Sequence, residues 1–273
     1  MTFDKLFSEA ESLPTIPKVV QDLINALHNE NVSVSEVARK IELDQVIAAK
    51  LLRLANSAYY GLNNRVASID KAIHMLGFST MRTLVIGVGL SGCFKSIPNV
   101  DLPTFWRHCI RVACVSRALA RPAKVDANTA FTVGLMHAIG HLLMALGLPE
   151  MAALNASHAI HAIDRNVVEE ETFGFSFAVV SAELMSRWNF APEFQTTMLN
   201  FNAPLDADPF GPLAGVLHLA SWRVSFEEQG LSSGELFNIW PEEVADKLGI
   251  SMADIQAIPS PKNLTADLES LLG

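Results

Sequence analysis

The sequence predicts an all-α protein, a compact multi-helix array. Half of its 273 residues are hydrophobic and 18% are charged, a balance typical of a globular chain rather than a disordered one. Apolar residues recur at helical spacing almost throughout; the stripe Val19, Val20, Leu23, Ile24 and Leu27 is an example. Alternating runs with hairpin turn chemistry, which would predict strands, are absent from the sequence.

Start signals for helices place the elements of the N-terminal half. Short hydroxyl side chains that can cap a helix precede four apolar runs: Thr15, Ser33, Ser68 and Ser79. The first run begins near Pro17, and the second has Glu36 three residues after Ser33, the spacing of a capping box. The other two runs predict helices over 69–76 and 80–90, and a further helix is expected over 45–55.

The C-terminal half follows a polar break with prolines at 96–103. Apolar periodicity there predicts helices over 104–120, 127–148, 150–164, 178–188, 192–199, 213–228, 241–248 and 265–272. The second of these is expected to bend near Gly140, and the proline-rich segment 202–212 predicts a loop.

The charge pattern bears on partners. The net charge is −9, which repels phosphate backbones, so nucleic acid is not an expected partner. Two runs of like charge are interpreted as solvated helix surface. They are the acidic run Glu169 to Glu171, expected at a helix start, and a basic stretch close to one helical face: Arg107, Arg111, Arg117, Arg121 and Lys124.

A cytoplasmic location without membrane contact is expected. The longest nearly apolar run noted in the sequence, 84–90, is far shorter than the roughly 20 residues of a membrane helix. The N-terminus is acidic rather than basic and apolar, unlike a signal peptide. Three cysteines without CxxC spacing are typical of reduced, buried thiols.

A first group of motifs occupies the N-terminal half. In order, the chain contains LPTIP at 13–17, LD at 43–44, LRLANSAYYGL at 52–62 and AIHMLG at 72–77. This succession resembles the signature of the HDOD family, with Gln45 where a proline usually follows the acidic residue.

The segment 56–62 has two interpretations. One is a corner between helices, in which Asn56 and Ser57 satisfy backbone groups and Gly61 provides a positive φ, as Gly77 does later. The other is a contact with a ligand or partner, for which the candidates are Asn56, Ser57, Tyr60 and Gly61.

A second group of motifs resembles the metal-binding parts of HD phosphohydrolases, the catalytic relatives of HDOD proteins. His108 matches their first metal-binding histidine, and His137, in GLMHAIG at 134–140, matches the histidine of their His-Asp pair. The aspartate of that pair is Ala138 here. At later ligand positions the resemblance places Phe177, the Asn-Phe-Asn run 200–202 and Ser221.

The resemblance therefore implies a dismantled metal site. A catalytic divalent centre needs three or more donors and carboxylates that offset the charge and hold a water. Two imidazoles are a poor site, so no catalytic residue, bound metal or cofactor is expected, with His108 and His137 as vestiges. They join the candidates for ligand or partner contact.

The remaining histidines are interpreted as structural. His137 and His141 share a helical face, but no glutamate stands between them as a zinc HExxH motif requires. His158 and His161 are expected on an amphipathic helix. His218 lies in an apolar stretch, where burial with a backbone partner is expected.

These observations predict a lead-in helix at 1–12, an HDOD domain at 13–204, and C-terminal helices at 205–273 packed on the same core. The resemblance implies a bacterial-type, non-catalytic signalling module that binds a partner protein or a small ligand. The alternative is a divergent metal-dependent phosphohydrolase acting on a nucleotide or cyclic dinucleotide. A nucleic-acid regulator using the basic stretch is a third possibility.

Overall fold

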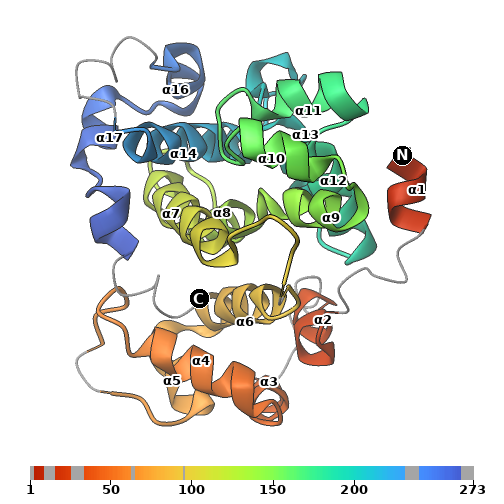
Figure 1. Ribbon diagram of the computed structural model, residues 1–273. Coiled ribbons are helices and arrows are strands. Elements are labelled where there is room, and N and C mark those ends of the chain that lie inside the picture. Colours follow the sequence, from red (N-terminus) through yellow and green to blue (C-terminus); the bar gives the residue numbers. More distant parts are fainter. Residues whose placement is uncertain are drawn as a thin grey trace.

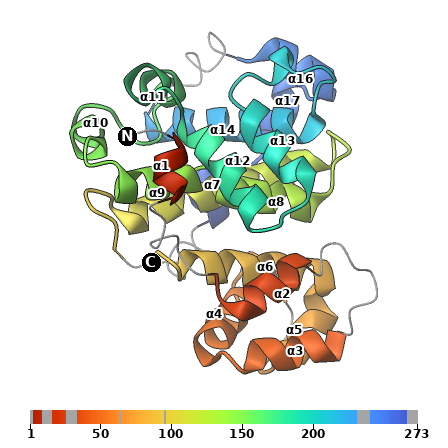
Figure 2. The ribbon, with the colours of Figure 1, turned by 90° about the vertical axis from the view of Figure 1, so that its right-hand side faces the viewer.

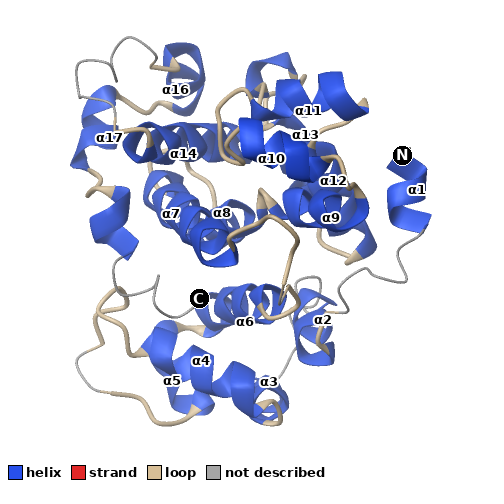
Figure 3. Ribbon diagram, in the orientation of Figure 1, coloured by secondary structure: helices blue, strands red, loops and turns tan. Residues whose placement is uncertain are grey.

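The computed structural model describes residues 3–8, 16–25, 34–62, 65–94, 96–230 and 240–265. Every regular element within these ranges is a helix, and none is a strand (Figure 3). The chain forms an N-terminal layer from residues 18–91 and a C-terminal layer from residue 102 onward, one below the other in Figure 1. The predicted all-α fold class is confirmed.

Five helices make the N-terminal layer: α2 (Lys18–Asn25), α3 (Val34–Glu42), α4 (Gln45–Ala55), α5 (Ile69–Leu76) and α6 (Phe78–Ser91). Ser68 caps α5 as predicted, accepting the Lys71 N–H at 3.3 Å. Ser79 is not an N-cap, because α6 already begins at Phe78 behind Gly77, whose φ of 84° ends α5. The predicted caps Thr15 and Ser33 lie outside the described residues.

The C-terminal layer contains the helices from residue 102 onward, some of which surround the cavity described below. They are α7 (Leu102–Ala120), α8 (Ala127–Met136), α9 (Ile139–Gly147), α10 (Met151–Ser157), α11 (Arg165–Phe173), α12 (Phe177–Arg187), α13 (Pro192–Asn200), η3 (Pro204–Asp206), α14 (Pro212–Glu228), α16 (Glu242–Leu248) and α17 (Met252–Ala257). Residues 261–265 are helical too, and the rest of the predicted helix 265–272 lies outside the described residues. Helix α14 packs against α7 and α8, and α6 joins the two layers by packing against α8.

A short N-terminal helix, α1 (Phe3–Ser8), lies on the C-terminal layer beside α9 and α12 rather than on the N-terminal one (Figure 2). The Phe3 ring meets the Phe175 ring edge-on at 5.4 Å between centroids. The Arg187 guanidinium lies 4.5 Å from the centre of the Phe7 ring, a cation–π distance. The chain start is therefore tied to the part of the fold that contains the cavity.

The predicted helix 127–148 is two helices, and the break falls at His137 and Ala138 rather than at Gly140. The Ser181 hydroxyl of α12 spans this break, donating to the His137 carbonyl at 3.0 Å and accepting the Gly140 N–H at 2.9 Å. Such bonds replace those that a continuous helix would make internally. Gly140 itself permits the close approach, because a Cβ there would lie 2.1 Å from the Phe177 carbonyl oxygen.

The stretch Ala127–Gly147, which spans this break, is long and apolar enough to cross a membrane by composition alone. The sequence-based search, which stopped at the shorter run 84–90, overlooked it. In the fold, 89% of its most apolar window is buried inside the protein, as expected for helices of a protein core.

The predicted helix 150–164 ends early. Helix α10 stops at Ser157, where the His158 N–H bonds the Leu154 carbonyl at 2.8 Å, and residues 158–164 form a turn-rich loop. His161 therefore lies on a loop, not on an amphipathic helix with His158. This loop forms one wall of the cavity.

The packing of α8 on α7 brings His137 toward His108 and leaves no room for a side chain at Gly134. A Cβ there would lie 2.6 Å from the Ala113 Cα of α7. We expect Gly134→Ala to lower the free energy of unfolding by about 1–3 kcal/mol, because backbone cannot move aside without moving the helix. Urea denaturation measures it.

The matched control is Gly211→Ala at the start of α14, where φ is −92° and a Cβ would meet its nearest neighbour at an ordinary 3.7 Å. We expect a loss below about 1 kcal/mol there, because alanine is a poorer N-cap than glycine but meets no clash. Equal losses in the two variants would contradict the proposed close packing of α7 and α8.

Candidate functional site

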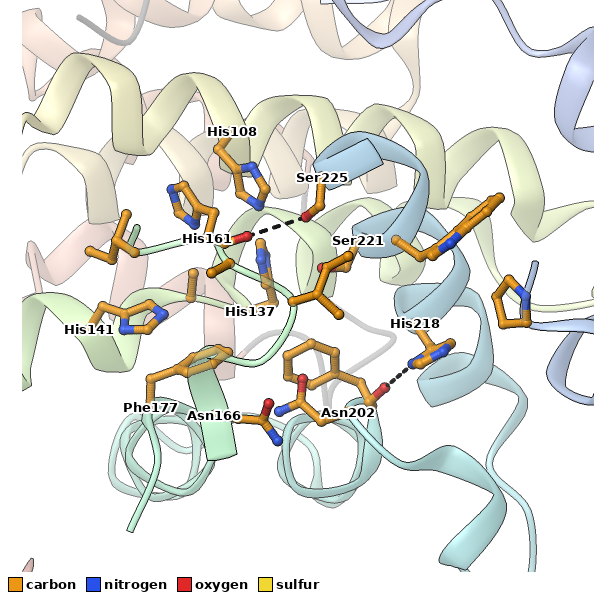
Figure 4. A pocket seen from close by; sticks show the side chains of 17 residues that line it. His108, His137, His141, His161, Asn166, Phe177, Asn202, His218, Ser221 and Ser225 are labelled. Atoms are coloured by element: carbon orange, nitrogen blue, oxygen red, sulfur yellow. Dashed lines mark hydrogen bonds between the residues drawn. The ribbon is translucent and has the colours of Figure 1, made fainter. Parts of the chain in front are cut away.

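A cavity of about 340 Å³ lies in the C-terminal layer between α7, the break between α8 and α9, the loop 158–164, α12 and α14 (Figure 4). It reaches the surface beside Ile163, which is 56% exposed. The residues that line it are His108, His137, Ala138, His141, Ile160, His161, Ala162, Ile163, Asn166, Phe177, Phe201, Asn202, His218, Ser221, Trp222, Ser225 and Pro241.

The positions aligned with the HD metal centre meet at this cavity. His108, His137 and Ala138 line one part of it. The later and less certain positions line it as well: Phe177, Phe201, Asn202 and Ser221. Segments separated by more than 100 residues in the chain thus surround one space. The resemblance to one metal centre had predicted that these positions lie around a common site.

His108 is held by a carboxylate at the end of α14. Its Nδ1 lies 2.7 Å from Glu228 Oε2, and the other oxygen of Glu228 accepts a hydrogen bond from Arg111 at 3.1 Å. Burial alone would raise the pKa of Glu228, but His108 and Arg111 hold it below its usual value. The carboxylate is therefore ionised and fully engaged with His108 and Arg111.

A second carboxylate, on α11, lies within ion-pair distance of His141. The His141 Nδ1 lies 3.0 Å from Glu169 Oε1, and that oxygen also accepts the Arg165 Nε–H at 2.8 Å. The other oxygen accepts the Phe177 N–H at 2.7 Å. Arg165 further donates to the His158 carbonyl at 2.8 Å and to Asn155. The network fixes the cavity loop between α10 and α11.

The prediction that Glu169 belongs to a solvated helix start is wrong. Helix α11 begins at Arg165, which puts Glu169 one turn inside it, and the side chain is fully buried. Burial raises its pKa, but His141, Arg165 and the Phe177 N–H outweigh burial and keep the pKa below the usual value. Its neighbour Glu170 is exposed, as predicted.

His161 was interpreted as structural, yet it is a cavity residue. Its ring stacks on that of His108, with 3.6 Å between centroids and 8° between planes. Its Nε2 is buried and has no protein hydrogen-bond partner. Burial, and next the neighbouring His108, keep the pKa of His161 well below its usual value.

Two further histidines are fixed by backbone carbonyls. His137 Nδ1 lies 2.7 Å from the Gly134 oxygen, and His218 Nδ1 lies 2.8 Å from the Phe201 oxygen. A carbonyl only accepts, so Nδ1 carries the proton in both rings. Burial lowers the pKa of His218 and lowers that of His137 to about 3, so both rings are neutral with a bare Nε2. The predicted backbone partner of His218 is confirmed.

These residues do not fit the divalent metal centre of an HD hydrolase. The cavity lining contains five histidines but no aspartate, glutamate or cysteine, and Ala138 is buried where the bridging carboxylate belongs. Among the described residues, no group of three or more histidine, cysteine, aspartate or glutamate side chains lies close enough together to hold one metal ion. Glu169 and Glu228 stand behind the histidines and are committed to arginines, so a hard cation lacks anionic ligands here.

The N-terminal candidates lie elsewhere. Asn56 donates to the carbonyls of Leu52 and Val66 and accepts the Val66 N–H at 2.8 Å, while Ser57 donates to the Leu54 carbonyl at 2.7 Å. Gly61 has a φ of 57°, as the corner interpretation expects. None of the four candidates, Asn56, Ser57, Tyr60 and Gly61, lines the cavity.

The basic stretch on α7 is not one free face. Arg111 is paired with Glu228, and the Arg117 guanidinium lies 5.8 Å from the centre of the Tyr60 ring. Arg121 and Lys124 are exposed.

The fold defines an all-helical protein with an HD/HDOD-like arrangement of helices. Residues 13–204 match the model of the HDOD domain, and the chain belongs to this family. It is 30% identical to a Shewanella amazonensis structure named as a proposed phosphohydrolase, with a TM-score of 0.78 and coverage of 98% of this chain and 96% of that one.

Two other relatives are longer than this chain. A Marinobacter aquaeolei structure named as a proposed signal transduction protein is 24% identical, with a TM-score of 0.74; it is matched over 97% of this chain and 59% of its own. An uncharacterized Treponema pallidum protein is 25% identical over 220 residues, which are 79% of this chain and 43% of the relative. The chain thus spans less than half of that relative.

The buried Glu169 gives a stability prediction. Glu169→Gln keeps the shape of the side chain but leaves the buried Arg165 without its counter-charge, which we expect to cost about 3–5 kcal/mol of unfolding free energy. Glu170→Gln is the matched control one residue away, on an exposed side chain, where we expect a change within about 0.5 kcal/mol. Similar unfolding midpoints in urea for the two variants would disprove this role of Glu169.

The neutral histidines give a pH prediction. Their pKa values in the folded state lie below the unfolded value of about 6.5, so the unfolded chain binds more protons and stability falls as pH drops from 7 to 5. Each such ring contributes up to about 1.4 kcal/mol per pH unit. His161→Phe keeps an aromatic ring but should flatten the slope; an unchanged slope would show that His161 is protonated in the fold.

Proposed function

We propose that this chain is a non-catalytic signalling module that binds a small ligand or a partner protein, and that its cavity is a dismantled HD metal site turned to recognition. The observation that supports this proposal is the absence of any carboxylate from the lining of the cavity. Hydrolysis of a phosphoester by the HD mechanism requires anionic ligands and a metal-activated water, and the side chains present supply neither.

The arrangement of the two nearby carboxylates supports the proposal further. A carboxylate that served a metal would have to leave its present partners, but Glu169 and Glu228 each bridge a histidine and an arginine. Breaking the buried pair of Glu169 with Arg165 leaves an uncompensated charge and costs several kcal/mol. The name of the Marinobacter aquaeolei relative, a proposed signal transduction protein, agrees with a signalling role.

The second candidate is a divergent metal-dependent phosphohydrolase. It is favoured by the retained pair His108 and His137, whose ring centroids lie 5.6 Å apart, and by the name of the Shewanella amazonensis relative. Imidazoles bind late transition metals well, so a site for zinc or iron is the form this candidate would take.

Elemental analysis and a turnover assay separate the two functions. The full chain is loaded with zinc, iron or manganese, desalted and analysed, then assayed with p-nitrophenyl phosphate and bis(p-nitrophenyl) phosphate. We expect no stoichiometric metal and a rate equal to that of a His108→Gln/His137→Gln double variant, because the first-shell carboxylates are missing.

The control is His74→Gln, a change at an exposed histidine of α5. A stoichiometric ion and measurable turnover, both kept in His74→Gln and both lost in the double variant, would establish the phosphohydrolase and overturn the signalling proposal.

A further inference from the structure

The hydrogen-bonding character of the cavity restricts what it can bind, provided that the proposed recognition function holds. His137 and His218 use Nδ1–H on backbone carbonyls, which leaves Nε2 as a bare acceptor in each ring. His161 Nε2 is buried and lacks any protein partner. A ligand that satisfies acceptors must bring N–H or O–H donors, since unpaired buried polar atoms are costly.

Charge restricts the ligand further. No lysine, arginine, aspartate or glutamate lines the cavity. A phosphate or carboxylate group would lose its hydration without gaining a cation, and an ammonium would gain no anion. The ligand is therefore uncharged. The volume of about 340 Å³ lies at the lower end of the range of about 300–1,000 Å³ for small-molecule sites, so the ligand is also small.

The aromatic walls indicate a flat ligand. Phe177 lies parallel to His141, with 3.9 Å between centroids, and Phe201 meets Phe177 edge-on at 6.0 Å. Trp222 lines the cavity, and its buried Nε1–H has no partner. Ring faces of this kind stack on planar groups.

The wall opposite His108 and His161 supplies groups that can read an edge of such a ring. Asn166 and Asn202 both line the cavity, and Figure 4 shows them on the side away from His108 and His161. An amide carries both a donor and an acceptor and pairs in two places with the edge of a base, as asparagine does with adenine. The lining of the cavity thus combines amides with bare acceptor nitrogens.

We propose that the cavity binds a small, uncharged heteroaromatic molecule with N–H donors, the chemistry of a free nucleobase. Stacking on the aromatic walls holds the ring, the Nε2 atoms of His137 and His218 accept its N–H groups, and the two asparagines read its edge. The absence of a cationic side chain selects the base over its phosphorylated nucleotide.

Calorimetric titration of the full chain tests this with adenine and cytosine, and with purine, 2-pyrimidinone and AMP as matched probes. We expect at least one of the two bases to bind. Its analogue without the amino donors should bind about tenfold or more weakly, because a site built for an N–H rejects a molecule that lacks it. AMP should bind more weakly than adenine.

Two variants on opposite walls place the binding. His161→Phe keeps the stacked ring and loses the unpaired ring nitrogen, and Asn202→Ala removes an amide from a partly exposed position. We expect each to weaken binding by about 3- to 10-fold, the worth of one hydrogen bond, and His74→Gln to leave it unchanged. Because Asn202 is not in the core, its variant tests the site even where His161→Phe is poorly folded.

Three results would overturn the inference: binding of neither base, tighter binding of AMP than of adenine, or a zinc ion bound in place of a base and lost in His161→Phe. These failures leave the proposed non-catalytic function standing. The non-catalytic function would instead be disproved by phosphoester turnover, which the binding titration does not measure.

Discussion

The pairing of two carboxylates with arginines determines the chemistry of this fold. Glu169, which is fully buried, pairs with Arg165, and Glu228, which is partly exposed, pairs with Arg111; each carboxylate lies against the Nδ1 of one histidine. A buried pair such as Glu169 with Arg165 is costly to break, so it fixes the side chains around it. Neither carboxylate lines the cavity, which is polar but without a formal anion.

Close helix packing also positions the histidines around the cavity. Gly134 allows α8 to approach α7, and Gly140 allows the α8–α9 break to approach α12, where Ser181 replaces the missing helical bonds. His137 lies at that break, with its Nδ1 turned back onto its own helix. The packing thus presents imidazoles around the cavity. Ala138 lines it at the position where the resemblance to HD phosphohydrolases places an aspartate.

Much of the fold could be predicted from the sequence, because helical periodicity and caps such as Ser68 are local signals. The resemblance also located the positions that surround the cavity, down to Phe177 and Ser221. It could not identify the network behind them. Glu228 follows His108 by 120 residues, and nothing in the local pattern of Glu169 to Glu171 distinguishes the buried member from its solvated neighbours.

The prediction of a helix through residues 158–164 was wrong for a related reason. Its composition continues the helical pattern of α10, and only the tertiary bond from Arg165 to the His158 carbonyl shows why the helix stops. His161 therefore could not be recognised as a cavity residue. A buried arginine or glutamate in a helix with an otherwise polar surface indicates such a network. Burial of one charged residue, however, cannot be predicted from a single sequence.

The state of the imidazoles is the most direct measure of this account. Nitrogen-15 NMR of histidine-labelled protein at neutral pH reports which ring nitrogen carries a proton. The account predicts neutral His137 and His218, protonated at Nδ1 and bare at Nε2. Imidazolium rings, or protons on Nε2, would contradict it, because the cavity would then offer donors or positive charge instead of acceptors.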